Sequence, residues 1–149
     1  SYETNLRLGW LCYLAGQQNE SLKYYTNATV LKPMSVEAKF GITYPLAGLN
    51  KWATVVQEYN KILKISPNNS AALYKLGLIS YNKKDFITAE KYFEKIVNLY
   101  PFDYDGLNML GWTKYNLKKY RGAKVLFYKA LMNTPEGASA KEGAYLLEK

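Results

Sequence analysis

The feature that most constrains the fold of this sequence is the regular spacing of its prolines. Four of the five recur at one fixed interval: Pro33, Pro67, Pro101 and Pro135. Proline lacks an N–H donor and disfavours helical geometry in the residue before it, so each of the four is expected to end a helix. A fixed period of roughly 20–50 residues indicates a stacked array of repeated helical or stranded units.

Other residues follow the same period. A Leu-Gly pair recurs at Leu8-Gly9, Leu76-Gly77 and Leu110-Gly111. Twelve residues after each glycine comes a small residue, in turn Ser21, Ala89 and Ala123. Four residues later comes an aromatic one, in turn Tyr25, Phe93 and Phe127. The second repeat departs from the pattern, with Thr43 and Val55 at the first two places, and retains only the aromatic residue, Tyr59.

These residue types suit two short antiparallel helices. Glycine and alanine carry almost no side chain, so two helices can approach closely where such residues face each other. We therefore expect Gly77 to face Ala89 and Gly111 to face Ala123, with the aromatic residue filling the wedge where the helices diverge. One such hairpin cannot bury its apolar faces alone, so neighbouring hairpins must stack.

The pattern resembles that of the tetratricopeptide repeat family, W-x2-L-G-x2-Y, then A-x3-F, then P, over about 34 residues. The resemblance covers four units, roughly 2–35, 36–69, 70–103 and 104–137, and departs from the family at the leading Trp, where Asn5, Lys39, Leu73 and Leu107 stand. It implies an all-α fold: a single domain over 1–149 built as a right-handed superhelical solenoid of four helix-turn-helix units. A further helix, about 138–148, has polar residues on its outer side and is expected to cap the last pair.

The length and composition of the chain limit its possible domain size and its relation to a membrane. Its 149 residues, 48% of them hydrophobic, suffice for one sizeable domain. No apolar run approaches the roughly 18–20 residues of a membrane span, so we expect none. The chain begins almost at a repeat boundary, without a start Met or a signal-peptide pattern, so we expect a piece of a longer protein or a mature form. Cytoplasm and bacterial periplasm both remain open.

The chain lacks the residues that most catalytic sites need. It contains no His, which removes the commonest general base and metal ligand. Its one Cys, Cys12, reads as a small core residue, and its ten glycines form no phosphate-binding loop. We therefore expect no enzyme, no cofactor, no metal site and no small-molecule substrate.

The candidate binding site is an aromatic stripe on the first helix of each unit. The resemblance implies that these helices line the inner, concave wall of the array. Residues spaced i, i+4 and i+7 share a helix face, and that face carries Leu6, Trp10, Tyr13, Phe40, Tyr44, Tyr74, Leu78, Tyr81, Asn108, Trp112 and Tyr115. Tyr and Trp are enriched at binding hot spots, which favours a protein scaffold that holds a peptide or partner helix in this groove. The simpler alternative is that these side chains pack between successive first helices.

A second hypothesis rests on the net charge of +8. The densest basic group is Lys118, Lys119, Arg121 and Lys124, with Lys83 and Lys84 at the matching turn one repeat earlier. This basic edge suggests binding of nucleic acid or an anionic envelope component, whereas the simpler interpretation is a solvated edge that keeps the array soluble. The polar residue pairs of helical RNA-reading repeats are absent, which argues against nucleic acid. The N-terminal repeat lacks a cap, so self-association through it is a further expectation.

Overall fold

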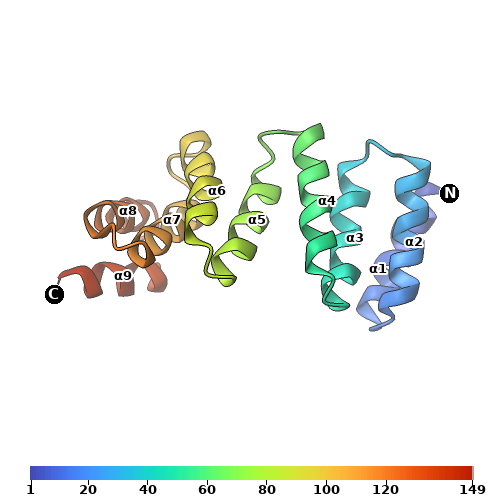
Figure 1. The fold of residues 1–149 in the computed structure, drawn as a ribbon, viewed down its shortest axis with the longest axis horizontal. Coiled ribbons are helices and arrows are strands. Elements are labelled where there is room, and N and C mark those ends of the chain that lie inside the picture. The colour runs from blue at the N-terminus through green and yellow to red at the C-terminus, as the bar shows by residue number, and fades with distance from the viewer. Residues whose placement is uncertain (149) are drawn as a thin grey trace. The chain divides into compact units, whose positions relative to one another are not determined.

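The structure, a computed structural model, describes residues 1–148, and within them it contains nine α-helices and no β-strand (Figure 1). The predicted all-α repeat fold and its extra C-terminal helix are thereby confirmed. The helices are α1 (Tyr2–Leu14), α2 (Gln18–Leu31), α3 (Val36–Gly48), α4 (Trp52–Ile65), α5 (Ser70–Asn82), α6 (Phe86–Leu99), α7 (Tyr104–Asn116), α8 (Tyr120–Asn133) and α9 (Ala138–Glu148).

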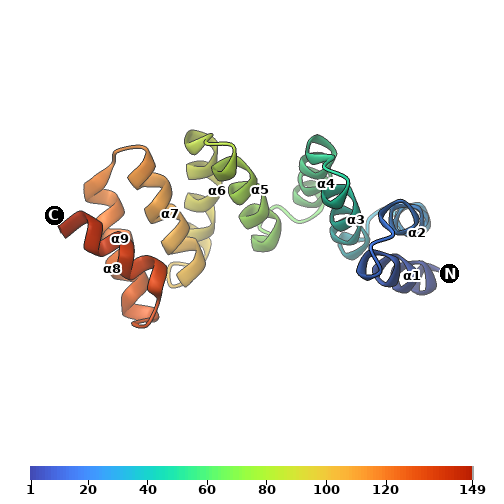
Figure 2. The ribbon, with the colours of Figure 1, turned by 90° about the horizontal axis from the view of Figure 1, so that it is seen from below.

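The chain divides into two compact units. Unit 1 is Ser1–Ala72 and holds α1 to α4; unit 2 begins at Leu73 and holds most of α5 with α6 to α9. In unit 1, α1 packs on α2, α2 on α3 and α3 on α4, and α1 also contacts α3. In unit 2, α7 packs on both α6 and α8, while α9 contacts α7 and α8 (Figure 2).

The starts of the first helices recur with the proline period. Ser1, Ser35, Asn69 and Asp103 each accept a hydrogen bond from the backbone N–H three residues further on, at 3.2, 3.3, 3.0 and 2.8 Å. Such caps satisfy an N–H group that has no partner within the helix. The polar residue after each predicted helix end therefore starts the next helix at a defined place.

The turns inside the hairpins follow the same period. Gly16, Asn50, Lys84 and Lys118 all have left-handed backbone geometry, with φ of 78°, 58°, 63° and 63°. Glycine adopts this geometry without strain and asparagine tolerates it, whereas lysine does so at a cost. The two hairpin turns of unit 1 therefore carry residues suited to the geometry, and those of unit 2 do not.

The glycines of the repeated Leu-Gly pairs lie against the aromatic rings of their own repeats. In the first repeat the small residue also meets the glycine, since the Ser21 hydroxyl donates a hydrogen bond of 2.6 Å to the Gly9 carbonyl. A Cβ at Gly77 would lie 2.6 Å from the Phe93 ring, and one at Gly111 would lie 2.7 Å from the Phe127 ring. Ala89 and Ala123 are fully buried, but the space left by the glycines is taken by the rings. A side chain at either glycine would therefore collide with the ring.

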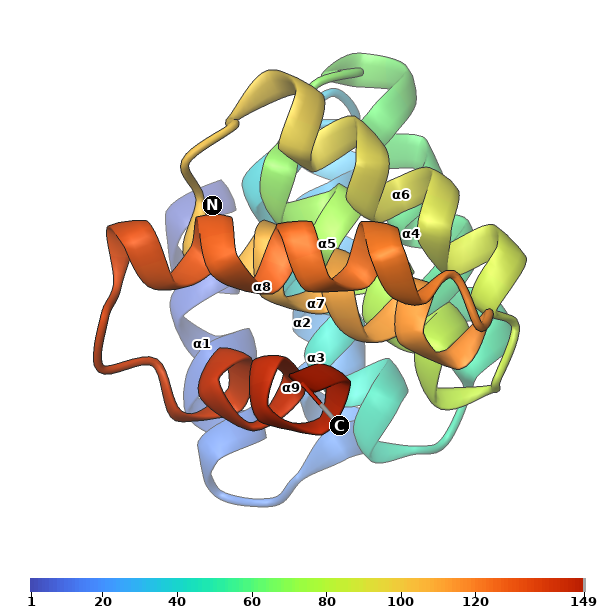
Figure 3. The ribbon, with the colours of Figure 1, turned by 90° about the vertical axis from the view of Figure 1, so that its left-hand side faces the viewer.

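Two of these rings lie between two glycines. Tyr25 on α2 packs between Gly9 on α1 and Gly41 on α3, and Phe127 on α8 packs between Gly111 on α7 and Gly143 on α9. Helix α9 lies beside α8 and buries Ala140 and Ala144 as well as Gly143 (Figure 3). It thus covers the last hairpin as the first helix of a further repeat would.

Candidate functional site: the aromatic faces of the first helices

Three aromatic side chains of unit 1 meet on the face shared by α1 and α3. The ring centroids of Trp10 and Tyr44 are 5.7 Å apart with the planes at 77°, and Tyr13 lies 5.6 Å from Trp10 and 5.4 Å from Tyr44. Trp10 is nevertheless 43% exposed and Tyr44 42% exposed. The rings therefore hold one another in place while they still present large apolar surface to solvent.

A hollow of about 580 Å³ opens between α1 and α3 beside these rings. We call it the α1–α3 hollow; its lining is Glu3, Leu6, Arg7, Trp10, Tyr25, Glu37, Phe40, Gly41 and Tyr44. Four of the five residues that the sequence stripe assigns to this unit line it, and the fifth, Tyr13, contacts two of the rings. In unit 1 the structure thus brings the predicted residues together around one open space.

The sequence reasoning missed the three charged residues of this lining. Glu3 and Glu37 lie in the first turns of α1 and α3, where the helix dipole alone accounts for a carboxylate. Their spacing carries a further signal, because residues three or four apart share a helix face: Glu3 and Arg7 flank Leu6, and Glu37 precedes Phe40 by three. Extending the stripe by one turn toward the N-terminus would have found Glu3 and Glu37, and Arg7 lies one turn after Glu3.

Tyr25 lies at the inner side of the hollow. Its side chain is 4% exposed and packs against Gly9 and Gly41. Burial raises the pKa of the Tyr25 hydroxyl, and the nearby Tyr44 and Glu37 raise it further by charge repulsion. Glu37 is in turn within 3.4 Å of the Tyr2 hydroxyl, which also hydrogen-bonds the Ser35 side chain at 2.5 Å. The Glu37 carboxylate therefore lies close to both the Tyr2 and the Tyr25 side chains.

In unit 2 the stripe residues of α5 are more enclosed. Tyr74 packs on Phe93 with centroids 5.8 Å apart, and Tyr81 packs on Phe86 at 5.2 Å. The Asn116 side-chain amide donates a hydrogen bond of 3.0 Å to the Tyr81 hydroxyl. Tyr74, Leu78 and Tyr81 are all half-buried. These side chains combine internal packing with a limited open surface.

The stripe residues of α7 lie largely beneath α9. Asn108 is only 7% exposed, and its amide donates to the Ser139 hydroxyl at 3.0 Å. The Trp112 indole N–H donates to the same hydroxyl at 2.9 Å, and its ring packs on Phe127 at 5.1 Å and on Tyr115 at 5.5 Å. Asn108 and Trp112 therefore contribute to internal packing and not to an open binding surface.

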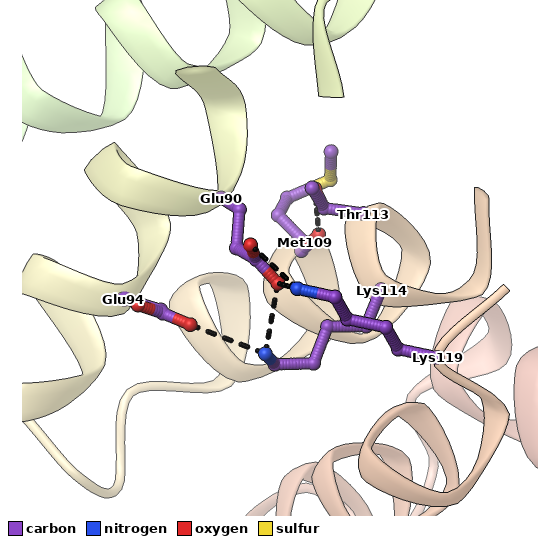
Figure 4. A network of polar contacts seen from close by, with 6 residues as sticks. All are labelled: Glu90, Glu94, Met109, Thr113, Lys114 and Lys119. Carbon is purple, nitrogen blue, oxygen red and sulfur yellow. Dashed lines mark hydrogen bonds and ion pairs between the residues drawn. The ribbon is translucent and has the colours of Figure 1, made fainter. Parts of the chain in front are cut away.

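The predicted basic edge is partly neutralised by acidic partners. Lys119 pairs with Glu90 at 3.0 Å and Lys124 with Glu148 at 3.8 Å. Lys114, nearby on α7, bridges Glu90 at 2.9 Å and Glu94 at 3.1 Å, so that two carboxylates and two ammonium groups form one network (Figure 4). Burial raises the pKa of the Glu90 carboxyl, but the hydrogen bonds and charges of Lys114 and Lys119 outweigh it and hold this pKa below its ordinary value.

Both helices of the first hairpin expose apolar side chains. Leu11 and Leu14 on α1 are 52% and 61% exposed, and Val30 and Leu31 on α2 are 72% and 54% exposed. Val30 and Leu31 line a smaller hollow of about 290 Å³ with Asn5 and Asn27. Within the described chain, α1 and α2 contact each other and α3, and no further helix packs on them.

Residues 1–148 contain neither a metal-binding cluster nor a membrane-spanning helix. No three His, Cys, Asp or Glu side chains of that range gather where they could hold a metal ion. Its helices are also too short or too polar to cross a membrane.

Comparison with known sequences supports the repeat assignment. A tetratricopeptide repeat family model matches residues 58–91. A TPR repeat-containing protein of Methanocaldococcus jannaschii is 32% identical over 77 residues, which are 52% of this chain and 14% of that protein. The chain therefore spans a small part of the length of this curated relative.

Comparison with solved structures supports the fold over nearly the whole chain. A MamA structure from Desulfovibrio magneticus RS-1 has a TM-score of 0.86 and 20% identity, and covers 99% of this chain and 83% of its own. YrrB, described as a TPR protein with an unusual peptide-binding site, has a TM-score of 0.78 and 18% identity, and covers 96% of this chain and 74% of its own. At these identities the likeness is one of fold. With the family match, it confirms the predicted resemblance.

Proposed function

Because the chain carries the tetratricopeptide-repeat fold, we propose that it is a non-catalytic interaction module that binds a peptide or partner helix on the aromatic face of its first helices. Tetratricopeptide repeats generally mediate protein–protein interaction. The observation that carries the proposal is the α1–α3 hollow, with Trp10 and Tyr44 more than two-fifths exposed at its side.

The physical case is that these rings are both exposed and held in place. Ordering a side chain on binding costs conformational free energy. This cost is reduced for Trp10, Tyr13 and Tyr44, because they are already restricted by packing on one another. Tyr and Trp also offer a large contact area with few rotatable bonds. The size of the hollow falls within the range of ligand pockets in proteins.

The two units contribute unequally to this proposal. The half-buried Tyr74, Leu78, Tyr81 and Tyr115 give unit 2 a secondary contact surface, whereas Asn108 and Trp112 belong to the packing beneath α9. We retain the division into four repeats as part of the proposal, since each predicted repeat contains one helix pair. The main contacts are assigned to Leu6, Trp10, Tyr13, Phe40 and Tyr44.

The test is a selection of binding segments followed by titration. Random twelve-residue peptides displayed on phage are selected on the immobilised chain, and the recovered peptides are synthesised and titrated against variants. Trp10→Ala and Tyr44→Ala are each expected to weaken binding by about 1–2 kcal/mol or more, as hot-spot residues do. Trp112→Ala is the matched control in unit 2, and thermal unfolding of each variant checks that the fold is retained.

The basic edge predicts a different outcome. The triple change of Lys118, Lys119 and Arg121 to Ala is expected to leave affinity at physiological salt nearly unchanged, because exposed rim charges mainly affect the association rate. If this variant loses binding while Trp10→Ala and Tyr44→Ala bind normally, the aromatic proposal is wrong. Steep weakening with rising salt would then identify the basic edge as the binding surface.

The exposed apolar side chains of the first hairpin support self-association as an additional proposal. Val30 and Leu31 are 72% and 54% exposed and line one small hollow. Sedimentation velocity across a concentration series is expected to show reversible association that Val30→Ser with Leu31→Ser removes. A monomer at every concentration would contradict it.

A further inference from the structure

We propose that the α1–α3 hollow receives a basic side chain, Lys or Arg, from the bound partner segment. This inference rests on the proposed function and states what the partner must supply. The hollow combines aromatic walls, two carboxylates and an open entrance, and each of these features bears on the charge of its occupant.

The aromatic walls favour a cation. An aromatic ring is negative on its faces, so an ammonium or guanidinium group is attracted to a position over a ring, best of all over Trp. The Trp10 and Tyr44 planes stand at 77° to each other, so the two rings form neighbouring walls and not one flat stack. Phe40 adds a third ring to the lining. An acidic group would gain no such attraction from the rings.

The charged residues of the lining favour a cation as well. Glu3 and Glu37 carry two negative charges and Arg7 one positive charge, a local balance of −1 in a chain whose net charge is +8. None of these three side chains takes part in an ion pair among the residues that the structure describes. An incoming Lys or Arg would therefore find carboxylates that no other cation has engaged.

Arg7 raises the opposite possibility, an acidic partner side chain. Such a side chain would gain one attractive contact with Arg7 but would lie near two carboxylates and the ring faces. The Glu37 carboxylate is also positioned by the Tyr2 hydroxyl at 3.4 Å. Its charge reaches the inner side of the hollow, since it contributes to the raised pKa of Tyr25 there. The balance of contacts therefore selects a cation.

The equivalent place in unit 2 provides a matched comparison. Three repeat lengths further on, Trp112 takes the place of Trp10, while Met109, Ser139 and Leu146 take the places of Arg7, Glu37 and Tyr44. Asp105 and Glu142 take the places of Glu3 and Phe40. Trp112 is thus a tryptophan in the same repeat position, with two carboxylates at equivalent positions but without the aromatic walls that Phe40 and Tyr44 provide. A response specific to Trp10 would separate the proposed site from general attraction of peptides to tryptophan.

The experiment uses four pentapeptides, acetyl-Ala-Leu-X-Leu-Ala-amide, with X as Lys, Arg, norleucine or Glu. Each is titrated into the full ¹⁵N-labelled chain up to its solubility limit, and the indole N–H resonances of Trp10 and Trp112 are followed by NMR. The Lys and Arg peptides are expected to shift the Trp10 resonance in a saturable way, with Kd about fivefold lower than that of the norleucine peptide. The Trp112 resonance is expected to remain in place.

The variants assign the effect to the hollow. Glu3→Gln and Glu37→Gln are each expected to reduce the preference for Lys over norleucine about two- to threefold, while Tyr44→Ala weakens the Lys peptide and leaves the fold intact. Glu142→Gln, an exposed change on α9, is the control expected to have no effect. Circular dichroism confirms that each variant is folded.

Three results would overturn the inference: equal or tighter binding of the norleucine peptide, preference for the Glu peptide, or no saturable shift of Trp10 with Lys or Arg. Its failure is distinguishable from that of the proposed function. Suppose that phage-selected segments need Trp10 and Tyr44 but keep their affinity when every Lys and Arg is replaced by norleucine. That result would contradict the cation site and would still support the proposed interaction surface.

Discussion

Tyr25 and Phe127 occupy equivalent places in the two units, and their neighbours show how one scaffold supports two different surfaces. Each ring lies between two glycines, Gly9 and Gly41 for Tyr25 and Gly111 and Gly143 for Phe127. The members of each equivalent pair are separated by the same number of residues, three repeat lengths. The backbone arrangement of α1, α2 and α3 is therefore repeated by α7, α8 and α9.

The side chains above the two rings differ. Trp10 packs edge-on against Tyr44 and remains 43% exposed beside the hollow. Trp112 instead donates its indole N–H to Ser139 on α9 and is half-buried. The difference lies in the covering helix, which offers Tyr44 in one case and a small hydroxyl in the other. A few surface residues thus decide whether the same helix geometry forms an open site or a closed cap.

Among the changes that test this comparison, removal of α9 should have the largest effect on stability. Deleting residues 138–149 uncovers Phe127, whose full burial is alone worth ~1.5–3 kcal/mol, and leaves Asn108 and Trp112 without their acceptor. We expect a clear fall in the thermal midpoint and self-association in sedimentation experiments. A truncated chain that stays monomeric with an unchanged midpoint would show that α9 is not a cap.

Replacing Gly111 and Gly9 by leucine tests whether the Phe127 and Tyr25 rings are equally confined. Gly111→Leu should lower the free energy of unfolding by about 1–3 kcal/mol, because the added side chain would collide with the fully buried Phe127. Gly9→Leu should cost less, since Tyr25 lines the open hollow whereas Phe127 is fully buried. Urea denaturation measures both.

The control for these variants is Gly122→Ala on α8. The added Cβ would come 3.2 Å from the flexible Lys114 side chain, so stability should be retained or raised. If Gly111→Leu is as stable as this control, the ring does not occupy the space that the structure assigns to it.

Changing the covering residue tests the hydrogen bonds. Ser139→Ala removes the acceptor shared by the buried Asn108 amide and the half-buried Trp112 indole, at a cost of about 1–2 kcal/mol. Glu37→Ala, at the equivalent position on α3, is exposed and should change stability by no more than about 0.5 kcal/mol. Faster hydrogen exchange of the Trp112 indole N–H in Ser139→Ala would confirm the contact; equal effects at both sites would contradict the comparison.

The hairpin turns should show the smallest difference. Lys84→Gly relieves the left-handed strain at φ 63° and should stabilise unit 2 by about 0.5–1 kcal/mol, after the greater entropy of glycine in the unfolded chain is allowed for. Asn50→Gly in unit 1 should change stability by no more than a few tenths of a kcal/mol, because asparagine tolerates this geometry. Denaturation midpoints of the two variants, measured side by side, check the prediction, and a loss of stability in Lys84→Gly would refute it.

The sequence by itself determined the repeat and the ends of its helices. Proline ends each second helix, a polar cap begins each first helix, and both act within a few residues along the chain, so the repeat period predicts them from local chemistry. The helical spacing of the aromatic residues likewise identified one face of each first helix. These properties depend on the order of residues and need no knowledge of what lies opposite.

Only the tertiary structure decided which parts of that face are open. The sequence pattern assigns Trp10 and Trp112 to equivalent positions of the stripe. In the structure Trp10 lies beside the open hollow between α1 and α3, whereas Trp112 lies against α9. Likewise, the glycine spacing predicted a close contact but not that the Phe127 ring would lie against Gly111. The physical reason is that periodicity describes one helix at a time. Exposure and contact depend on the side chains that a second helix, distant in sequence, places across from it.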